Sequence, residues 1–126
     1  MQRNIIASEN APAAIGAYSQ AVKAGNMLYV SGQIPYDKDG NPVEGGPAEQ
    51  TEQSLENVKA ILEEAGTSLS NVVKATIFAS DMENFSEINE VYSRYFTEEP
   101  PARAFVEVAR LPKDVDVEIE VIAICE

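Results

Sequence analysis

The sequence predicts an α/β (α+β) domain in which about six strands form a mixed sheet and two helices cover one face. Two long runs carry apolar residues at three- and four-residue steps, which is typical of amphipathic helices, and β-prone runs lie before, between and after them. Each helix therefore connects two strands, and right-handed crossovers place both helices on the same face of the sheet. The 126 residues fit one domain, residues 1–126.

The N-terminal third predicts a strand, a loop and a β-hairpin. Asn4–Ile6 begins the first strand, and Asn10–Gly16 is a loop because it contains proline and glycine. Ala21–Lys23 and Met27–Ser31 are β-prone runs. The Gly25-Asn26 pair between them tolerates the left-handed backbone of a hairpin turn, so these runs are expected to pair.

A surface loop over Asp37–Gly46 precedes the first helix, which is expected to begin near Pro47 because proline suits a first helical turn. Gly66 is available to end this helix. The apolar stripe of the helix, which requires one buried face, consists of Thr51, Leu55, Val58, Ile61, Leu62 and Ala65.

The second half predicts strand, helix, strand, strand. Val72–Ala79 is rich in β-branched and aromatic residues, and Phe105–Val108 and Val115–Ile124 give the last two strands. Pro100-Pro101 stops the second helix. The apolar positions of that helix are Phe85, Ile88, Val91, Tyr92, Tyr95 and Phe96.

The sheet face opposite the helices has no cover within the chain. Several strands carry apolar side chains on both faces, and leaving the second face in water exposes more apolar surface than monomers usually tolerate. Oligomerisation is therefore expected to cover it.

Composition excludes several classes of function. The formal net charge is -12, with no histidine and no basic run, so nucleic-acid binding is not expected. Neither a metal-ligand pattern nor a nucleotide-binding glycine motif is present. The single cysteine, Cys125, is expected to act as a small hydrophobe in a reducing cytoplasm, and neither a signal peptide nor a membrane span is expected.

Motifs along almost the whole chain together resemble one known family, the RidA (YjgF) family. Ala17, where proline is common, and Phe105, where cysteine is common, depart from its pattern and bear on the size of the substrate pocket. The segments that carry the resemblance are Ala11–Gln20, Ser31–Pro35, Gln53–Leu62, Val73–Phe78, Asn89–Tyr92, Pro101–Asp114 and Val117–Glu120.

The resemblance implies a chorismate-mutase-like fold, assembled as a homotrimer with sites in the clefts between subunits. It implies hydrolysis of reactive 2-imino acids to 2-oxo acids and ammonia, without a cofactor. The substrates are 2-iminopropanoate and 2-iminobutanoate, which pyridoxal-phosphate-dependent serine and threonine dehydratases release.

Two residues carry the implied chemistry. Arg103 holds the substrate carboxylate, since a guanidinium binds a carboxylate through two parallel hydrogen bonds. Glu118 positions the attacking water or acts as general base. By residue type alone, Arg103 is equally a solvated residue at the start of an edge strand, and Glu118 belongs with Glu120 on the wet side of an alternating strand.

The resemblance assigns five further residues to substrate binding. Tyr18 offers an aromatic wall and a hydroxyl, and Ser31 and Asn89 offer neutral hydrogen-bonding groups. Ala104 and Phe105 contribute backbone N–H groups. Taken singly, Tyr18, Ser31 and Asn89 are equally a packing residue, a turn residue and a solvated helix residue.

Strand directions place Arg103 and Glu118 apart. Because a short connector reverses the chain between their strands, the two residues are expected near opposite ends of the sheet, on the order of 20 Å apart. They share a site only if Arg103 of one subunit faces Glu118 of the next.

Two alternatives stand beside the deaminase. The same clefts serve equally as a non-catalytic sensor of 2-oxo acids or small carboxylates, which needs Arg103 but not Glu118. Ribonuclease activity or inhibition of translation, also attached to this family, finds little support in a chain that is strongly acidic and lacks histidine.

Overall fold

The computed structural model describes residues 2–126, and its element order matches the expected one. Three one-turn 3₁₀ segments, Leu69–Asn71, Met82–Asn84 and Pro112–Asp114, were not expected. The longer elements are β1 (Arg3–Ile6), β2 (Ala21–Ala24), β3 (Met27–Gln33), α1 (Pro47–Ala65), β4 (Val72–Ala79), α2 (Phe85–Tyr95), β5 (Ala102–Glu107) and β6 (Val117–Ile124).

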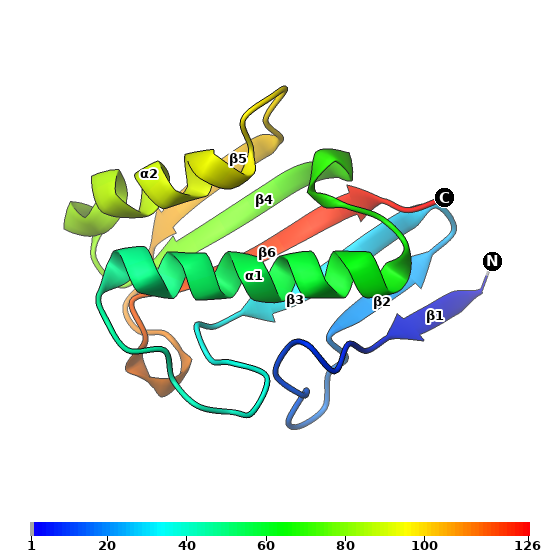
Figure 1. Cartoon of the computed structure of the whole chain (residues 1–126), viewed down its shortest axis with the longest axis horizontal. Coiled ribbons are helices and arrows are strands. Elements are labelled where there is room, and N and C mark those ends of the chain that lie inside the picture. Colours follow the sequence, from blue (N-terminus) through cyan, green and yellow to red (C-terminus); the bar gives the residue numbers. More distant parts are fainter. Residues whose placement is uncertain (1) are drawn as a thin grey trace.

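The strands form one mixed sheet in the order β1-β2-β3-β6-β4-β5. Strand β5 runs parallel to β4, and the other neighbouring pairs are antiparallel. Both helices lie on the same side of the sheet (Figure 1), so the expected architecture is confirmed. The last strand in sequence, β6, is inserted between β3 and β4, which leaves β5 at one edge of the sheet and β1 at the other.

Two strand boundaries differ from the expected ones. Strand β5 begins at Ala102 instead of Phe105, because parallel pairing with β4 extends back to Lys74. Strand β6 begins at Val117 instead of Val115. The residues before it form a one-turn 3₁₀ segment in which Lys113 has a φ of 60°, a left-handed conformation that cannot continue a strand.

Local sequence accounts for the boundaries of α1 and of the hairpin. Pro47 occupies the first turn of α1, and the N–H of Gly46 donates to Oε1 of Glu49 at 2.9 Å. The helix ends at Gly66, whose φ of 88° favours glycine. Between β2 and β3, Gly25 has a φ of 62°, as expected for the hairpin turn.

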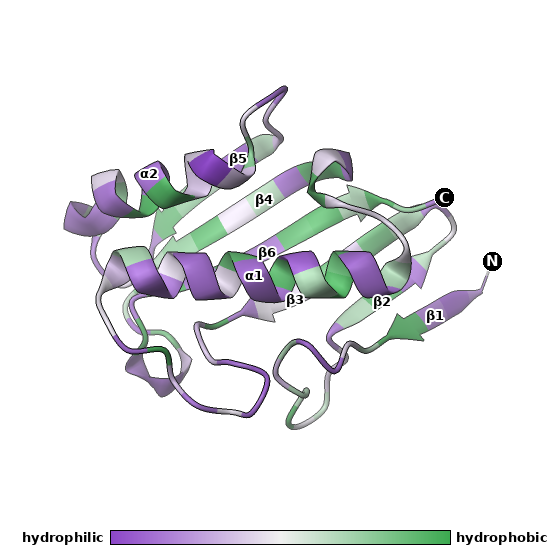
Figure 2. Cartoon of the chain, in the orientation of Figure 1, coloured by the Kyte–Doolittle hydropathy of each residue, from purple (hydrophilic) through white to green (hydrophobic). Residues whose placement is uncertain are grey.

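The core lies between the helices and the sheet. On β6 the alternate residues Val117, Ile119 and Val121 are buried, and they meet the buried face of α1, which includes Leu55 and Leu62. Figure 2 shows the apolar colouring of β4 and β6 beneath helices whose outer surfaces are largely hydrophilic. Full burial of each such aliphatic side chain contributes roughly 1.5–3 kcal/mol.

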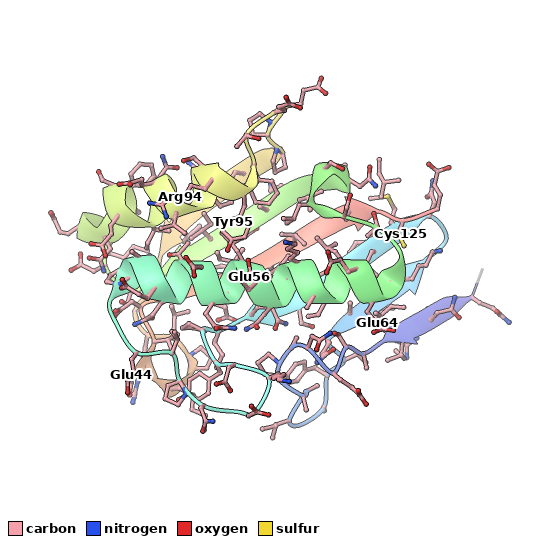
Figure 3. All side chains as sticks on the ribbon, viewed as in Figure 1. Glu44, Glu56, Glu64, Arg94, Tyr95 and Cys125 are labelled. Carbon is pink, nitrogen blue, oxygen red and sulfur yellow. The ribbon has the colours of Figure 1, made fainter. Side chains whose placement is uncertain are left out.

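Helix α2 is held against α1 by packing and by a polar contact. The hydroxyl of Tyr95 donates to Oε2 of Glu56 at 2.6 Å, and Figure 3 shows the two side chains between the helices. Burial, followed by this carboxylate, raises the pKa of Tyr95, so the hydroxyl stays a donor. The contact fixes the helix that carries Asn89.

The opposite face of the sheet carries no helix. A row of apolar residues crosses it in register, from Ile5 through Val22 and Tyr29 to Ile122. Ile5 and Tyr29 are 54% and 48% exposed, which is far more than apolar side chains in a core. This face, which we call the open face, also carries Glu118 and Glu120.

Candidate active site

Arg103 lies on the helix side of the edge strand β5. Its register partner on β4 is Ala75, which is completely buried under the helices, so the side chain of Arg103 extends toward α2. There its NH1 donates to Oδ1 of Asn89 at 2.6 Å. Two residues expected at the site, Arg103 and Asn89, are thus in direct contact.

Aromatic rings surround the guanidinium of Arg103. Its Cζ lies 5.0 Å from the ring centroid of Tyr92, 5.8 Å from that of Phe85 and 6.0 Å from that of Phe105. These distances fall within the range of cation–π attraction. We call Arg103, Asn89 and the three rings the cationic half of the site.

No carboxylate neutralises this arginine among residues 2–126. The two ion pairs in that range join Arg94 to Glu90 and Arg110 to Asp114. The whole chain has 21 acidic residues, yet Arg103 is held by a neutral amide and by rings. The arrangement leaves its charge available to an anionic ligand.

A groove of about 420 Å³ opens beside Arg103. Its volume is in the range of small-molecule sites, roughly 300–1,000 Å³. The residues that line the groove are Asn89, Tyr92, Ser93, Phe96, Pro100, Pro101 and Arg103.

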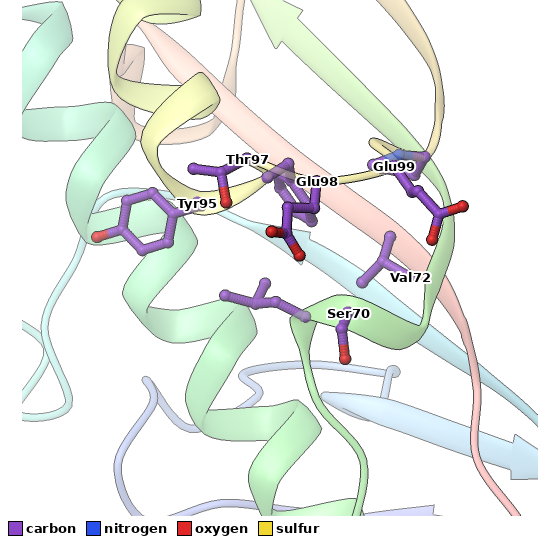
Figure 4. A pocket seen from close by; sticks show the side chains of 9 residues that line it. Ser70, Val72, Tyr95, Thr97, Glu98 and Glu99 are labelled. Carbon is purple, nitrogen blue, oxygen red and sulfur yellow. The ribbon is translucent and has the colours of Figure 1, made fainter.

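A second hollow of about 140 Å³ lies between the end of α2 and the start of β4 (Figure 4). It presents the carboxylates Glu98 and Glu99 and no cation. Because the expected substrates are anions, the groove beside Arg103 is the better candidate.

Glu118 lies on the other face of the sheet. It pairs with Phe78 across β4 and β6, on the open face, and its carboxylate covers the backbone of Gly32 so closely that a Cβ there would overlap its Oε2. Partial burial, followed by the nearby charge of Glu120, raises the pKa of Glu118. A raised pKa makes a carboxylate a stronger base once it is ionised.

Ser31 and Tyr18 lie beside Glu118 in the chain's layout. The Oγ of Ser31, the residue before Gly32, donates to the carbonyl of Ser19 at 2.6 Å. Tyr18, next to Ser19, is 52% exposed. Glu118, Ser31 and Tyr18 form what we call the acidic half of the site.

A buried amide fixes the loop that carries Tyr18. Oε1 of Gln20 accepts from the N–H of Ser8 at 2.6 Å, and its Nε2 donates to the carbonyl of Pro12 at 2.7 Å. The backbone carbonyl of Gln20 also accepts from the N–H of Ser31 at 2.9 Å. Tyr18 is therefore part of a loop that is anchored to β3.

Backbone direction separates Ala104 from Phe105. The N–H of Val108 donates to the carbonyl of Ala79 on β4 at 2.9 Å. Because successive N–H groups along a strand point to opposite sides, the N–H of Ala104 also points to β4. The N–H of Phe105 points to the open edge, which makes it the one of the two that is available to a ligand.

The two halves do not meet within one chain. Strands β5 and β6 run in opposite directions, as expected. However, Arg103 is level with Ala75 and Glu118 with Phe78, so they are offset by ~10 Å along the sheet and not by the seven-residue span behind the expected ~20 Å. Their side chains lie on opposite faces, and the sheet itself separates them.

Three contributors were not anticipated from the sequence. Phe85 and Tyr92 looked like core positions of a helix, since both belong to its apolar stripe. Gly32 stood inside a recognised motif, but nothing in the sequence indicated that Glu118 covers it. Within residues 2–126, no cluster of three potential metal ligands occurs, and no helix is long and apolar enough to cross a membrane.

Comparison with known proteins gives a consistent result. The family model described as endoribonuclease L-PSP matches residues 8–125. A RutC family protein of Pyrococcus horikoshii is 57% identical over 122 residues, covering 96% of this chain and 97% of the relative. The 2-iminobutanoate/2-iminopropanoate deaminase of Escherichia coli K12 is 52% identical over 122 residues, covering 94% of this chain and 95% of that protein.

A solved structure matches the fold over the whole chain. The crystal structure of yeast Mmf1 has a TM-score of 0.97 at 49% identity and covers 99% of this chain and 100% of that one. The Saccharomyces cerevisiae protein is named as mitochondrial. Relatives of this chain thus occur outside the cytoplasm.

Proposed function

The chain belongs to the RidA (YjgF) family, and on that premise we propose that it hydrolyses 2-iminopropanoate and 2-iminobutanoate to the 2-oxo acids and ammonia. The observation that carries the proposal is the unpaired guanidinium of Arg103, held by Asn89 and aromatic rings beside a groove. A 2-imino acid has a carboxylate next to its C=N carbon. Binding that carboxylate fixes the position of the carbon that water attacks.

Arg103 and the edge of β5 form the carboxylate site. The free N–H groups of the guanidinium fork match the two oxygens of a carboxylate. The N–H of Phe105 supplies a further donor at the strand edge. Asn89, which accepts from Arg103, orients the fork.

Glu118 positions and activates the water. It accepts a proton as the water oxygen bonds to the imine carbon, which gives a carbinolamine. Transfer of that proton to nitrogen then lets the C–N bond break, so ammonia leaves and the 2-oxo acid forms. The raised pKa of Glu118 supports this role, and general acid–base catalysis contributes roughly 10²–10⁴-fold in rate.

Assembly brings the two halves together. Because Arg103 and Glu118 lie on opposite faces of the sheet, a complete site requires Arg103 of one subunit and Glu118 of another. The apolar row on the open face supports association of that face with a second copy. A cyclic homotrimer with three sites between subunits meets both requirements.

The supply of substrate and the compartment follow from the same chemistry. Pyridoxal-phosphate-dependent dehydratases acting on serine and threonine release these imines, so the protein acts downstream of them and needs only water as its own co-reactant. The buried thiol of Cys125 donates to the carbonyl of Ala65 at 3.2 Å, which fits a reducing cytoplasm.

Release of ammonia from freshly generated 2-iminopropanoate tests the proposal. The wild type is expected to exceed the spontaneous rate, and Arg103→Ala and Glu118→Ala each to lose at least about 100-fold in kcat/KM. Arg94→Ala and Glu90→Ala, which split an exposed pair on α2, serve as controls with full activity.

The same assay separates the deaminase from its alternatives. A sensor binds 2-oxo acids through Arg103 but does not accelerate hydrolysis, so a wild type at the spontaneous rate would contradict the proposal. Binding of RNA that weakens with salt would instead favour the ribonuclease alternative, which the net charge of -12 opposes.

A further inference from the structure

Phe85 is the most exposed of the three rings around Arg103 whose role is not explained by packing alone. It begins α2 and is 36% exposed. Its ring lies 4.7 Å from that of Phe105 at an interplanar angle of 57°, a tilted arrangement that aromatic pairs favour. The Cζ of Arg103 lies 5.8 Å from the centre of the Phe85 ring.

An arginine in this position needs to be held. Its long side chain loses roughly 2 kcal/mol of rotamer entropy when it is fixed. Exposed on an edge strand and without an ion-pair partner among residues 2–126, Arg103 gains only the hydrogen bond to Asn89 and the contacts with the rings. The rings attract the cation without occupying its N–H groups.

From this geometry we infer that Phe85 is a positioning residue, whose ring face holds the guanidinium of Arg103 in the orientation that receives the substrate carboxylate. The inference rests on the proposed function. Asn89 fixes one end of the fork, and Phe85 limits its swing away from the groove. The tilted stacking on Phe105 in turn fixes the Phe85 ring.

Phe85 also offers the cleanest test of the three rings. Tyr92 is only 4% exposed and Phe105 packs against the core, so substitutions there disturb the fold. Phe85→Leu keeps the volume of the side chain close to that of the original and removes the ring. Phe85→Tyr keeps the ring and adds a hydroxyl where solvent is accessible.

The experiment measures the Kd of pyruvate, a stable 2-oxo acid, by calorimetry, and KM and kcat for 2-iminopropanoate. Phe85→Leu is expected to raise Kd and KM about fivefold with kcat nearly unchanged, because the carboxylate is held alike in the ground and transition states. Phe85→Tyr is expected to retain wild-type values. Tyr95→Leu, which removes a ring from the same helix away from Arg103, is the control.

Three results would overturn the inference. The first is an unchanged Kd and KM in folded Phe85→Leu. The second is equal impairment of Phe85→Leu and Phe85→Tyr, which would mean that the ring face is not what matters. The third is an equal rise in Kd for Tyr95→Leu. Because the pyruvate Kd does not depend on turnover, it tests Phe85 even if the wild type hydrolyses no imine and the proposed function fails.

Discussion

The cationic and acidic halves of the site differ in how each holds its charge. Arg103 is exposed at a sheet edge, and neutral groups hold it: the Asn89 amide and three rings. Glu118 is half-buried on the open face, covers Gly32, and has the like charge of Glu120 nearby. Neither residue has an ion-pair partner within residues 2–126.

This difference shows what each half lacks. The cation has donors to spare and no acceptor of opposite charge, whereas the carboxylate is partly desolvated and is repelled by its neighbour. Each half supplies what the other needs, yet the sheet separates them. Two unpaired, complementary charges on opposite faces of one sheet are what a site shared between subunits requires.

Gly32→Ala should break the acidic half with the largest effect. The added Cβ overlaps Oε2 of Glu118, so the carboxylate must move. We expect kcat to fall on the order of 100-fold, the contribution of a positioned base, while the Kd of pyruvate and the fold change little because only a side-chain tip is displaced.

Gly46→Ala is the matched control for that substitution. There the added Cβ comes no closer than 3.8 Å to Oε2 of Glu87, which is ordinary contact, so full activity is expected. Wild-type kcat in Gly32→Ala would show that the position of Glu118 over Gly32 is not the one that catalysis uses.

Tyr92→Phe should leave the ring beside Arg103 and change stability. The hydroxyl of Tyr92 is buried and has no hydrogen-bond partner in residues 2–126. An unsatisfied buried hydroxyl costs about 1 kcal/mol or more, so the variant is expected to gain about 1 kcal/mol in free energy of unfolding. Denaturant unfolding measures this, and a loss of stability would mean that the hydroxyl has a partner in the assembled protein.

Glu120→Gln should produce the smallest change, a shift in pH dependence. The charge of Glu120 is the second cause, after burial, of the raised pKa of Glu118. Removing it lowers that pKa, so the base stays ionised at lower pH and the acidic limb of the kcat/KM profile moves to lower pH. An unmoved limb, or a limb moved to higher pH, would mean that another group controls it.

The sequence predicted the fold well because its signals are local. Periodicity located both helices, Pro47 and Gly66 marked the ends of α1, and Gly25-Asn26 marked the hairpin turn. The start of β6 was missed because the left-handed Lys113 and Asp114 carry no glycine signal. The insertion of β6 between β3 and β4 also depends on long-range pairing, which no local pattern encodes.

The site was only partly predictable from the sequence. The motifs named Arg103 and Glu118, but their faces follow from strand register: Arg103 pairs with Ala75, and Glu118 with Phe78. The distance between them was overestimated because the connector, residues 108–116, allows a register shift that a tight reversal does not. The contact of Phe85 with Arg103 joins a helix start to an edge strand, and its helical spacing indicated only a core position.

Mixing two inactive variants tests the shared site most directly. Arg103→Ala and Glu118→Ala subunits, each inactive alone, are co-expressed in equal amounts and assayed for ammonia release from 2-iminopropanoate. In a closed ring of three, every mixed trimer contains one intact site, so about a quarter of wild-type activity is expected. Activity no higher than that of either variant alone, with mixed oligomers present, would contradict a site built from Arg103 of one subunit and Glu118 of the next.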